Sequence, residues 1–347
     1  MIRNVKIKFQ VARCAMVVLI MPTFLLSACA TGNSNKEAIQ REEKIEKVNF
    51  SYSEVTGIGI DPQFNRRDPS DVIKVGNKYY VWYTRMDKPI RSGYWGTIWY
   101  ATSVDDGHTW QEQGMALDLG AEGEFDSHSV FTPNILAYEG KYYLYYTAVQ
   151  PTPGNPDKKF ENNIHNDFTA IGLAVADSPD GPFERVANNP IMTVSSDSTA
   201  FDSYRIDDAS LLVKNGQIWL YYKGRCKAHG KEGPKRTQMG VAYAYKPEGP
   251  FKKHPQPLIE KGHEVLIWNQ NGGIASLASL SKSIHWANDG LNFSAIQTNL
   301  ADIPMAPGLY RPHLEDDNTS MEIPGWGISM RQGNGEAHLL RYEMKKE

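Results

Sequence analysis

Polar and ionisable side chains recur at one point of a repeated pattern along this 347-residue chain, just before or inside strand-like segments. The first is Asp68, which stands before Pro69 and the alternating run GNKYYVWYTR at 76–85. One aspartate before proline is typical of a turn, but five convergent placements indicate a functional site. The four later segments carry Asp126, Ser127, His128 and Thr132; Arg205, Asp207 and Asp208; His263, Glu264 and Trp268; and Tyr310, Arg311 and His313.

Glycoside hydrolysis is a reaction that such a set can perform, because it needs two groups that flank the scissile bond. The base must be ionised, and we expect nearby cations to lower the pKa of Asp68, with Arg66, Arg67 and Arg311 as the candidates. The acid must be protonated near neutral pH, which suits a buried carboxyl group or an imidazolium held by a carboxylate. His263 has a carboxylate neighbour in the sequence and is a candidate of the second kind, although a lone histidine is more often structural.

These side chains must be positioned by strands, because the chain after residue 50 repeats an aromatic strand pattern with hardly any helical periodicity. The runs at 76–85, 139–149 and 215–225 each follow a glycine-containing turn, and each is succeeded by a second strand and a second turn. Turn residues between alternating apolar runs indicate hairpins. Recurrence at such long intervals is the mark of a β-propeller. We therefore predict an all-β, five-bladed propeller, with a β-sandwich as the competing fold.

Two further segments complete this expected fold. Residues 327–344 are predicted to form the last outer strands, and residues near 50–60 to close the ring. The pattern Ser103-x-Asp105-x-Gly107-x-Thr109-Trp110 matches an Asp-box hairpin. That hairpin is structural, so it is given no catalytic role.

The N-terminus is predicted to be a targeting segment. A basic stretch precedes an apolar run at 14–26, which is too short to span a bilayer comfortably. It ends in Leu26-Ser27-Ala28-Cys29, which resembles a bacterial lipobox. We expect a lipoprotein signal peptide at 1–28, a tether and helical arm at 29–49, and a catalytic domain at 50–347. Lipid on Cys29 would anchor the protein to a bacterial membrane, on the periplasmic or the cell-surface side, while an ordinary secretory signal is the alternative.

Composition narrows the remaining possibilities. The formal net charge is −3 and no long basic run follows the N-terminus, so nucleic acid is not an expected partner. Cys226 stays alone in the mature chain and is expected to be buried and inert. No metal-binding motif is present, so no metal ligands are predicted and no cofactor is required, although a hydrated divalent cation in the central channel stays a possibility.

The ordered set of segments resembles the five-bladed glycosidases, which include arabinanases, xylosidases and fructan hydrolases. Within them it is most similar to glycoside hydrolase family 117, the α-1,3-(3,6-anhydro-L-galactosidases) that act on neoagaro-oligosaccharides. The residues that carry this resemblance are GYWGTIWYATSVDDGHTW, FDSHSVFTPN, YRIDDASLL, KGHEVLIWNQNGG and APGLYRPH. Together with the first repeat they cover nearly all of the chain after residue 50.

The resemblance implies a role for each matching position. Asp68 matches the general base, Asp207 the supporting carboxylate with Asp208 as the fallback, and His263 the acid. Residues implied in substrate binding are Glu264, Ser127, His128, Thr132, Trp99 and Arg311. The family further implies inversion of configuration, exo action on an oligosaccharide, and release of 3,6-anhydro-L-galactose from the non-reducing end. An N-terminal helical arm that pairs protomers would give residues 36–48 a purpose and predicts a homodimer.

Two alternatives stay open. A different five-bladed glycosidase, of the arabinofuranosidase or xylosidase type, would need a carboxylic acid as proton donor, and Glu260 or Glu264 would then be the candidate. A surface lipoprotein that binds glycan without cleaving it would need aromatic side chains and hydrogen-bond donors. Such a binder has no need for Asp68 and Asp207 at the mouth of a channel.

Overall fold

The computed structural model of the protein describes residues 47–150, 167–312 and 325–346, all of which lie within one compact unit, Glu43–Glu347. This unit is built from β-strands, with two 3-10 segments, η1 (Gly93–Trp95) and η2 (Lys227–Lys235). The predicted all-β fold is confirmed. The signal segment 1–28, Cys29, residues 36–46 of the arm and His313 lie outside the described residues. Residues 48 and 49, predicted to belong to the tether and helical arm, begin the strand Val48–Glu54 instead. No helix in the described part of the chain has the length and apolar character needed to cross a membrane.

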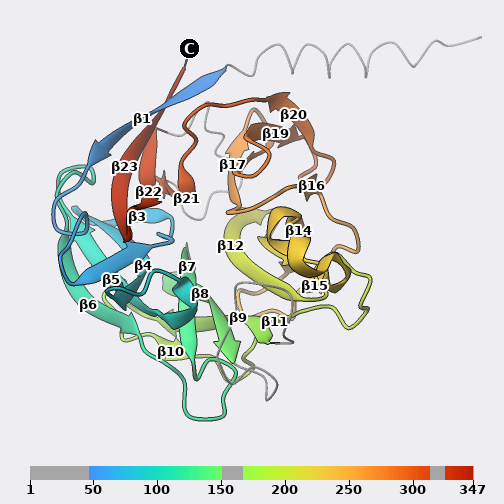
Figure 1. Ribbon diagram of the computed structural model, residues 1–347, viewed down its shortest axis with the longest axis horizontal. Coiled ribbons are helices and arrows are strands. Elements are labelled where there is room, and N and C mark those ends of the chain that lie inside the picture. The colour runs from blue at the N-terminus through green and yellow to red at the C-terminus, as the bar shows by residue number, and fades with distance from the viewer. Residues whose placement is uncertain (1–46, 151–166, 313–324, 347) are drawn as a thin grey trace, which may run out of the picture. The chain divides into compact units, whose positions relative to one another are not determined.

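The strands form four hydrogen-bonded sheets, arranged around a common centre in Figure 1. The largest contains, in spatial order, β1 (Val48–Glu54), β23 (Glu336–Lys346), β22 (Trp326–Gly333), β21 (Met305–Arg311), β3 (Val72–Val75), β4 (Lys78–Asp87), β5 (Thr97–Ser103) and β6 (Gln111–Leu117), with β2 (Phe64–Arg67) paired to β4. Its two halves, β1 to β21 and β3 to β6, are antiparallel four-stranded groups joined by one short parallel pairing, in which Tyr310 lies opposite Val72.

The other three sheets repeat the same antiparallel arrangement. The second contains β7 (Ser129–Tyr138), β8 (Lys141–Gln150), β9 (Phe168–Ala176), β10 (Glu184–Arg185) and β11 (Met192–Thr193). The third contains β12 (Arg205–Lys214), β13 (Gln217–Arg225), β14 (Gln238–Ala244), β15 (Lys252–Lys253) and β16 (Ile259–Glu260). The fourth contains β17 (Leu266–Gln270), β18 (Gly273–Ala278), β19 (Ser283–Ala287) and β20 (Ser294–Gln297).

Tight turns connect the first and second strands of these groups, as the sequence predicts. Between β12 and β13, Asn215 and Gly216 have φ values of +52° and +69°, and between β7 and β8, Glu139 and Gly140 have +48° and +75°. Positive φ at both central residues defines the type I′ turn, whose twist matches that of the flanking strands. These turns therefore fix the register between the first and the second strand of each hairpin.

The predicted Asp-box hairpin is structural, as expected. The Ser103 hydroxyl donates to Asp105 Oδ1 at 2.7 Å, and the same carboxylate oxygen accepts the Thr109 backbone N–H at 2.9 Å. The buried Trp110 indole donates to the Gly107 carbonyl at 2.9 Å, which closes the turn. These contacts satisfy the carboxylate within the turn and leave it no part in the site.

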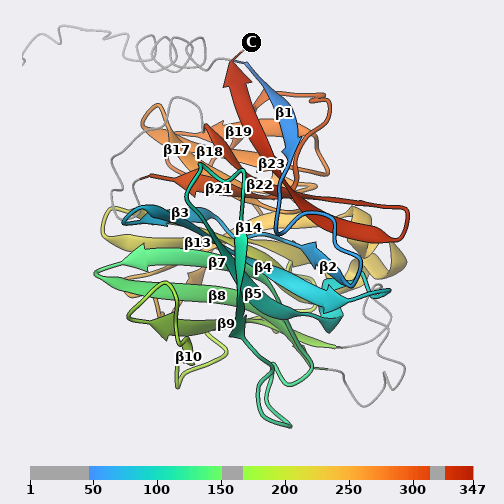
Figure 2. The ribbon, with the colours of Figure 1, turned by 90° about the vertical axis from the view of Figure 1, so that its left-hand side faces the viewer.

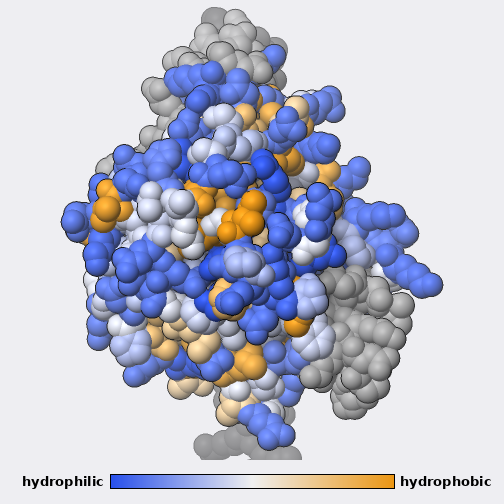
Figure 3. Space-filling view, turned by 60° about the vertical axis from the view of Figure 1, so that its left-hand side comes forward, coloured by the Kyte–Doolittle hydropathy of each residue, from blue (hydrophilic) through white to orange (hydrophobic). Residues whose placement is uncertain are grey.

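Apolar side chains fill the space between neighbouring groups of strands. Leu136, Leu211 and Leu220, for example, join β7 to β12 and β13, whereas Leu266 and Leu309 join β17 to β21. Figure 3 shows a face of the molecule on which hydrophilic residues predominate and apolar residues form small groups. The core therefore lies between the sheets, where sheet faces pack against each other.

The first strands of the groups contact one another in a closed sequence: β3 contacts β7, β7 contacts β12, β12 contacts β17, β17 contacts β21, and β21 pairs with β3. β1 pairs with β23 along its whole length, from Val48 opposite Lys346 to Glu54 opposite Leu340 (Figures 1 and 2). The first and last described strands thus hold each other, as predicted for the residues near 50–60 and 327–344. This differs from the two packed sheets of a β-sandwich.

Candidate active site

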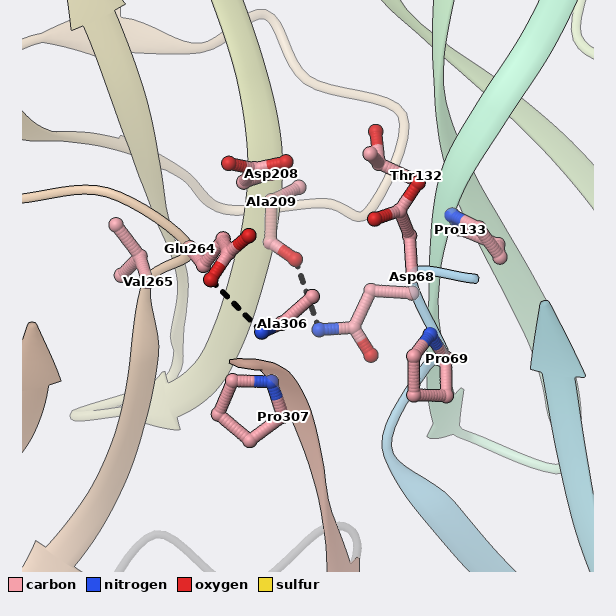
Figure 4. A pocket seen from close by; sticks show the side chains of 11 residues that line it. Asp68, Pro69, Thr132, Pro133, Asp208, Ala209, Glu264, Val265, Ala306 and Pro307 are labelled. Carbon is pink, nitrogen blue, oxygen red and sulfur yellow. Dashed lines mark hydrogen bonds between the residues drawn. The ribbon is translucent and has the colours of Figure 1, made fainter. Parts of the chain in front are cut away.

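Five segments share an unusual backbone feature at the centre of the sheets. In each, a non-glycine residue with positive φ precedes Pro, Ala or Val; the φ values are +49°, +44°, +54°, +53° and +44° in chain order. The pairs are Asp68-Pro69, Thr132-Pro133, Asp208-Ala209, Glu264-Val265 and Ala306-Pro307. Together with Asn134 they line a cavity of about 340 Å³, here called the axial pocket (Figure 4). Such strained conformations cost about 1–3 kcal/mol each and cluster at functional sites.

The same feature fixes which of two neighbouring aspartates is equivalent to Asp68. In β12 the strand register shifts between Asp207 and Ser210, and Asp208, with positive φ, lies in the bulge. Asp208 therefore occupies the position that Asp68 and Glu264 occupy in their own segments. The geometry favours Asp208, the fallback of the sequence prediction, over Asp207 as the matching carboxylate.

A second cavity of about 500 Å³, here called the polar pocket, shares Asp68, Thr132, Asp208 and Glu264 with the axial pocket, so the two cavities adjoin. Charged side chains of both signs surround it. Its other lining residues are Arg67, Ser92, Gly93, Tyr94, Phe131, Asp207, Lys223, Arg225 and His263. The structure thus brings together the three predicted catalytic residues Asp68, Asp207 and His263, and two predicted substrate-binding residues, Glu264 and Thr132.

Asp68 is buried and held by a single cation. Arg67 Nε donates to its Oδ2 at 2.7 Å, while Arg67 Nη1 donates to the Arg91 carbonyl at 2.8 Å. Burial raises the pKa of Asp68; Arg67 lowers it, and the charges of Asp208 and Glu264 raise it, with a net rise above the ordinary value. The expectation that neighbouring arginines would hold this pKa low is therefore wrong in its sign, because desolvation outweighs Arg67.

The other two arginines expected near Asp68 are engaged elsewhere. Arg66 forms ion pairs with Asp61 at 3.2 Å and with Glu112 at 2.9 Å. Arg311 donates to Asp71 Oδ2 at 2.6 Å and to the Ile267 carbonyl at 2.6 Å. Arg67 alone of the three contacts Asp68.

Asp207 and Asp208 share one lysine. Lys223, on β13, lies 3.1 Å from Asp207 Oδ1 and 2.7 Å from Asp208 Oδ2. Burial raises the pKa of both aspartates. For Asp208 the charges of Lys223 and His263 outweigh burial and give a net lowering, whereas for Asp207 burial and the charge of Asp208 leave a net rise. Lys223, whose own pKa is raised by the two carboxylates against the opposing effect of burial, therefore stays charged between them.

His263 and Glu264 form a second ionisable pair at the opening. His263 Nδ1 lies 3.6 Å from Glu264 Oε1, and Glu264 Oε2 accepts the Ala306 backbone N–H at 2.9 Å, a bond drawn in Figure 4. Burial raises the pKa of Glu264, but the His263 contact and the Ala306 hydrogen bond outweigh it and lower the net value. Ser279 Oγ donates to the His263 carbonyl at 2.8 Å and fixes this turn. The pair can act as an imidazolium held by a carboxylate.

Buried hydrogen bonds tie the inner segments together below the site. Asn134 Oδ1 accepts the Asp71 backbone N–H at 3.1 Å, and Asn134 Nδ2 donates to the Ala209 carbonyl at 2.8 Å. Asp71 Oδ1 in turn accepts the Leu309 backbone N–H at 2.8 Å. Asp71, Asn134 and Arg311 therefore position the segments that carry the site residues.

Four residues predicted to bind substrate are not among those that line the two pockets. The Trp99 indole donates to Thr97 Oγ1 at 3.0 Å, and its ring packs 3.5 Å from the Arg85 guanidinium. The His128 ring lies edge-on to Trp95, with 4.8 Å between centroids. The Ser127 backbone N–H donates to a neighbouring carbonyl, and the fourth residue is Arg311, bound as described above.

Gly93, Tyr94, Lys223 and Arg225 line the polar pocket but were not singled out from the sequence. The Lys-Gly-Arg end of the aromatic run at 215–225 was the available signal for two of them. Cys226 is buried, as predicted, and its thiol donates to the Thr199 carbonyl at 3.7 Å. Among the described residues, no group of three or more His, Cys, Asp or Glu side chains has the geometry to hold a metal ion. The hydrated cation stays a prediction.

Comparisons with known proteins agree with this arrangement. The model of glycosyl hydrolases family 43 matches residues 62–233. The structure of Zg3597, a family 117 glycoside hydrolase from the marine bacterium Zobellia galactanivorans, superposes with a TM-score of 0.74 at 27% identity and covers 87% of this chain and 91% of its own. An endo-arabinase from Bacteroides thetaiotaomicron superposes with a TM-score of 0.56 at 14% identity, over 85% of this chain and 99% of its own, and shows the shared fold.

Curated sequences give a shorter match. An extracellular endo-α-(1→5)-L-arabinanase from Thermotoga petrophila is 28% identical over 169 residues, which is 45% of this chain and 33% of that protein. The xylosidase/arabinosidase 43A of Humicola insolens is 30% identical over 127 residues, which is 36% of this chain and 35% of that protein. The matched region thus spans about a third of the length of these relatives.

The family 117 resemblance inferred from the sequence is confirmed by the first of these structures, and the family 43 match extends over the segments that carry Asp68, Asp208 and Lys223. The chain belongs to the superfamily of propeller glycoside hydrolases that includes families 43 and 117.

Proposed function

We propose that the protein is an exo-acting, inverting glycoside hydrolase that cleaves the α-1,3 bonds of neoagaro-oligosaccharides and releases 3,6-anhydro-L-galactose from the non-reducing end. The observation that carries this proposal is the meeting of Asp68, Asp208 and the His263–Glu264 pair at one opening, from three separate segments. The similarity to a family 117 enzyme over 87% of the chain supports this bond type over others.

Asp68 is the proposed general base. It accepts a proton from the water that attacks the anomeric carbon, so it must be ionised before the reaction. Its raised pKa makes the carboxylate a stronger proton acceptor, and the Arg67 contact at 2.7 Å keeps the ionised form available. Gly93 leaves room beside it, because a Cβ there would lie 3.2 Å from Asp68 Oδ2.

His263 is the proposed general acid. Its imidazolium donates a proton to the glycosidic oxygen as the bond breaks, and the neighbouring Glu264 carboxylate stabilises the protonated ring. Asp208 is the proposed supporting carboxylate, because it is ion-paired with Lys223 at 2.7 Å and lines the same opening as His263. Asp207 then acts mainly as the second ion-pair partner of Lys223.

A second candidate is an arabinofuranosidase or xylosidase, in which Glu264 is the proton donor. The observation in its favour is that Glu264 has the same positive-φ position as Asp68 and Asp208. Against it stands the lowered pKa of Glu264, which favours the ionised form. Glu260, the other carboxyl considered, lies on β16, is exposed and accepts a hydrogen bond from Gln238.

We also infer the parts of the architecture that go beyond the sheets themselves. Five blades are supported by the closed sequence of contacts among β3, β7, β12, β17 and β21 and by the two four-stranded halves of the largest sheet. Lipid attachment at Cys29, a location at the bacterial membrane and a homodimer through residues 36–48 are proposals that rest on the sequence.

Incubation of the purified chain 30–347 with neoagarobiose, followed by chromatography of the products, tests the function. Galactose and 3,6-anhydro-L-galactose are the expected products. An untouched disaccharide would overturn the proposal, and a panel of arabino-, xylo- and fructo-oligosaccharides would then distinguish the second candidate from a glycan-binding protein.

The acid is tested separately. His263→Ala should lose activity on neoagarobiose and regain part of it on substrates with a good leaving group, which need little protonation. If Glu264→Gln showed this rescue and His263→Ala did not, the acid role would belong to Glu264.

A further inference from the structure

Arg225 is a buried cation of the polar pocket to which the proposed mechanism gives no task. It ends β13, lines the pocket and is 6% exposed. Within the described ranges its Nε and Nη1 are buried without any hydrogen-bond partner. A buried donor without an acceptor costs about 1–3 kcal/mol, and more when it is charged. This arrangement therefore needs an explanation.

The other cations around the pocket each have an anionic partner at close range. Arg67 is paired with Asp68 at 2.7 Å, and Lys223 with Asp207 and Asp208 at 3.1 and 2.7 Å. Arg205, which lies opposite Arg225 in the ladder, donates to the Tyr94 hydroxyl at 2.6 Å and lies 3.5 Å from the Asp167 carboxylate. Among the described residues, Arg225 is thus a guanidinium of this wall that forms no ion pair.

We propose that Arg225 binds an oxyanion substituent of the substrate, so that the site prefers a sulfated or carboxylated galactan fragment to the neutral one. A planar guanidinium presents paired N–H donors that match the oxygens of a carboxylate or a sulfate ester. Because the inference names the substrate class of the same pocket, it rests on the proposed function.

The competing explanation is structural. The charge of Arg225 acts on Asp207, whose Oδ1 lies 3.1 Å from Lys223 Nζ. If the two side chains paired in solution, Arg225 would stabilise the fold and would not be available to a ligand. The two explanations predict opposite effects of removing the guanidinium: loss of a buried pair is strongly destabilising, whereas loss of an unpaired buried charge is neutral or stabilising.

Three disaccharides in which 3,6-anhydro-L-galactose is α-1,3-linked to D-galactose test the proposal: unsubstituted neoagarobiose, its 6-sulfate and its 6-carboxylate, the last two modified at C6 of the D-galactose unit. Binding is measured by titration calorimetry in an Asp68→Asn background, so that the disaccharides stay intact. Three proteins are compared, namely this background, the background with Arg225→Met, and the background with Arg331→Gln. The last is the control, because Arg331 is an exposed arginine paired with Glu54.

We expect one of the two charged disaccharides to bind about 10- to 100-fold more tightly than the unsubstituted one. Arg225→Met should abolish this preference without lowering the melting temperature, and Arg331→Gln should keep it. The identity of the tighter-binding charged disaccharide shows whether the oxyanion that Arg225 binds is a sulfate or a carboxylate. The proposal is overturned if neither binds better than the unsubstituted one, if the preference survives Arg225→Met, or if Arg225→Met melts several degrees lower.

Failure of this inference is distinguishable from failure of the proposed function. Hydrolysis of neoagarobiose by the wild-type protein without any preference for charged disaccharides would remove the oxyanion site and keep the reaction. A preference that depends on Arg225, together with no hydrolysis, would keep the oxyanion site and remove the reaction.

Discussion

Removal of the Arg67 charge is the most direct test of how the site controls the ionisation of Asp68, the proposed base. Arg67 Nε donates to Asp68 Oδ2 at 2.7 Å, and the two side chains are 19% and 7% exposed. Arg67→Gln keeps a polar side chain of similar length but deletes the cation. Burial and the nearby carboxylates, which raise the pKa of Asp68, would then act without opposition.

The size of the effect follows from the contact. A hydrogen bond to a charged group contributes about 1.5–3 kcal/mol, and 1.4 kcal/mol corresponds to a factor of ten in an equilibrium constant. Arg67→Gln should therefore favour the protonated form of Asp68 by about 10- to 100-fold. Because a protonated Asp68 cannot accept a proton, half-maximal kcat/KM on the acidic side should be reached at a proton concentration about 10- to 100-fold lower.

The assay is kcat/KM as a function of pH, measured with the disaccharide that the product test identifies. Arg91→Gln is the matched control, since it removes an exposed cation near Arg67 and keeps the backbone carbonyl to which Arg67 Nη1 donates. An acidic limb that stays in place in Arg67→Gln, with only the plateau reduced, would refute the assignment of that limb to Asp68.

Three further outcomes are expected. Asp208→Asn should lower kcat by about 100-fold and Asp207→Asn by clearly less, as steady-state kinetics would show; the reverse order would restore the register first predicted. Gly93→Ala should lower kcat/KM by about 10-fold with an unchanged melting temperature, because its Cβ would lie 3.2 Å from Asp68 Oδ2, and equal activity would show that the space is not needed. Asp71→Ala should lower the free energy of unfolding by about 3–5 kcal/mol in denaturant titrations, since it breaks a buried ion pair; a loss below 1 kcal/mol would contradict this.

The hairpins and the first site residue could be predicted because their signals are local. A glycine turn followed by alternating aromatic residues specifies a strand pair, and Asp68 stands shortly before the first of these turns. The choice between Asp207 and Asp208 could not be made in this way. Alternation places side chains on one face or the other only while the strand is regular, and a bulge of one residue reverses the assignment.

Lys223 is a site residue that can be recognised only once the pairing of β12 with β13 is known. Counting back from the Asn215–Gly216 turn places Lys223 opposite Asp208, but the bulge moves it opposite Asp207. Its side chain then lies between both carboxylates. The Lys-Gly-Arg end of the run at 215–225 marks a polar strand end, but it does not show that this lysine is buried between two carboxylates.

Arg311 illustrates the opposite error. Its place in the repeat suggested a sugar contact, yet its guanidinium is 11% exposed and bound to Asp71 and to the Ile267 carbonyl. A cation at the centre of the sheets can serve either the ligand or a neighbouring strand. Only the partner, which comes from another part of the chain, decides between these uses.

Three carboxylates, those of Asp68, Asp208 and Glu264, lie at equivalent backbone positions around the opening. Their mutual repulsion favours protonation of each, so their ionised forms need stabilising partners. Arg67 pairs with Asp68 and Lys223 with Asp208, while Glu264 lies 3.6 Å from the His263 ring. The balance differs among the three, since the pKa of Asp68 is raised while those of Asp208 and Glu264 are lowered. As the pH falls, Asp68 is thus protonated before Asp208. A base gains proton affinity as its pKa rises, whereas the lowered pKa values of Asp208 and Glu264 favour their negative charge beside His263, the proposed acid.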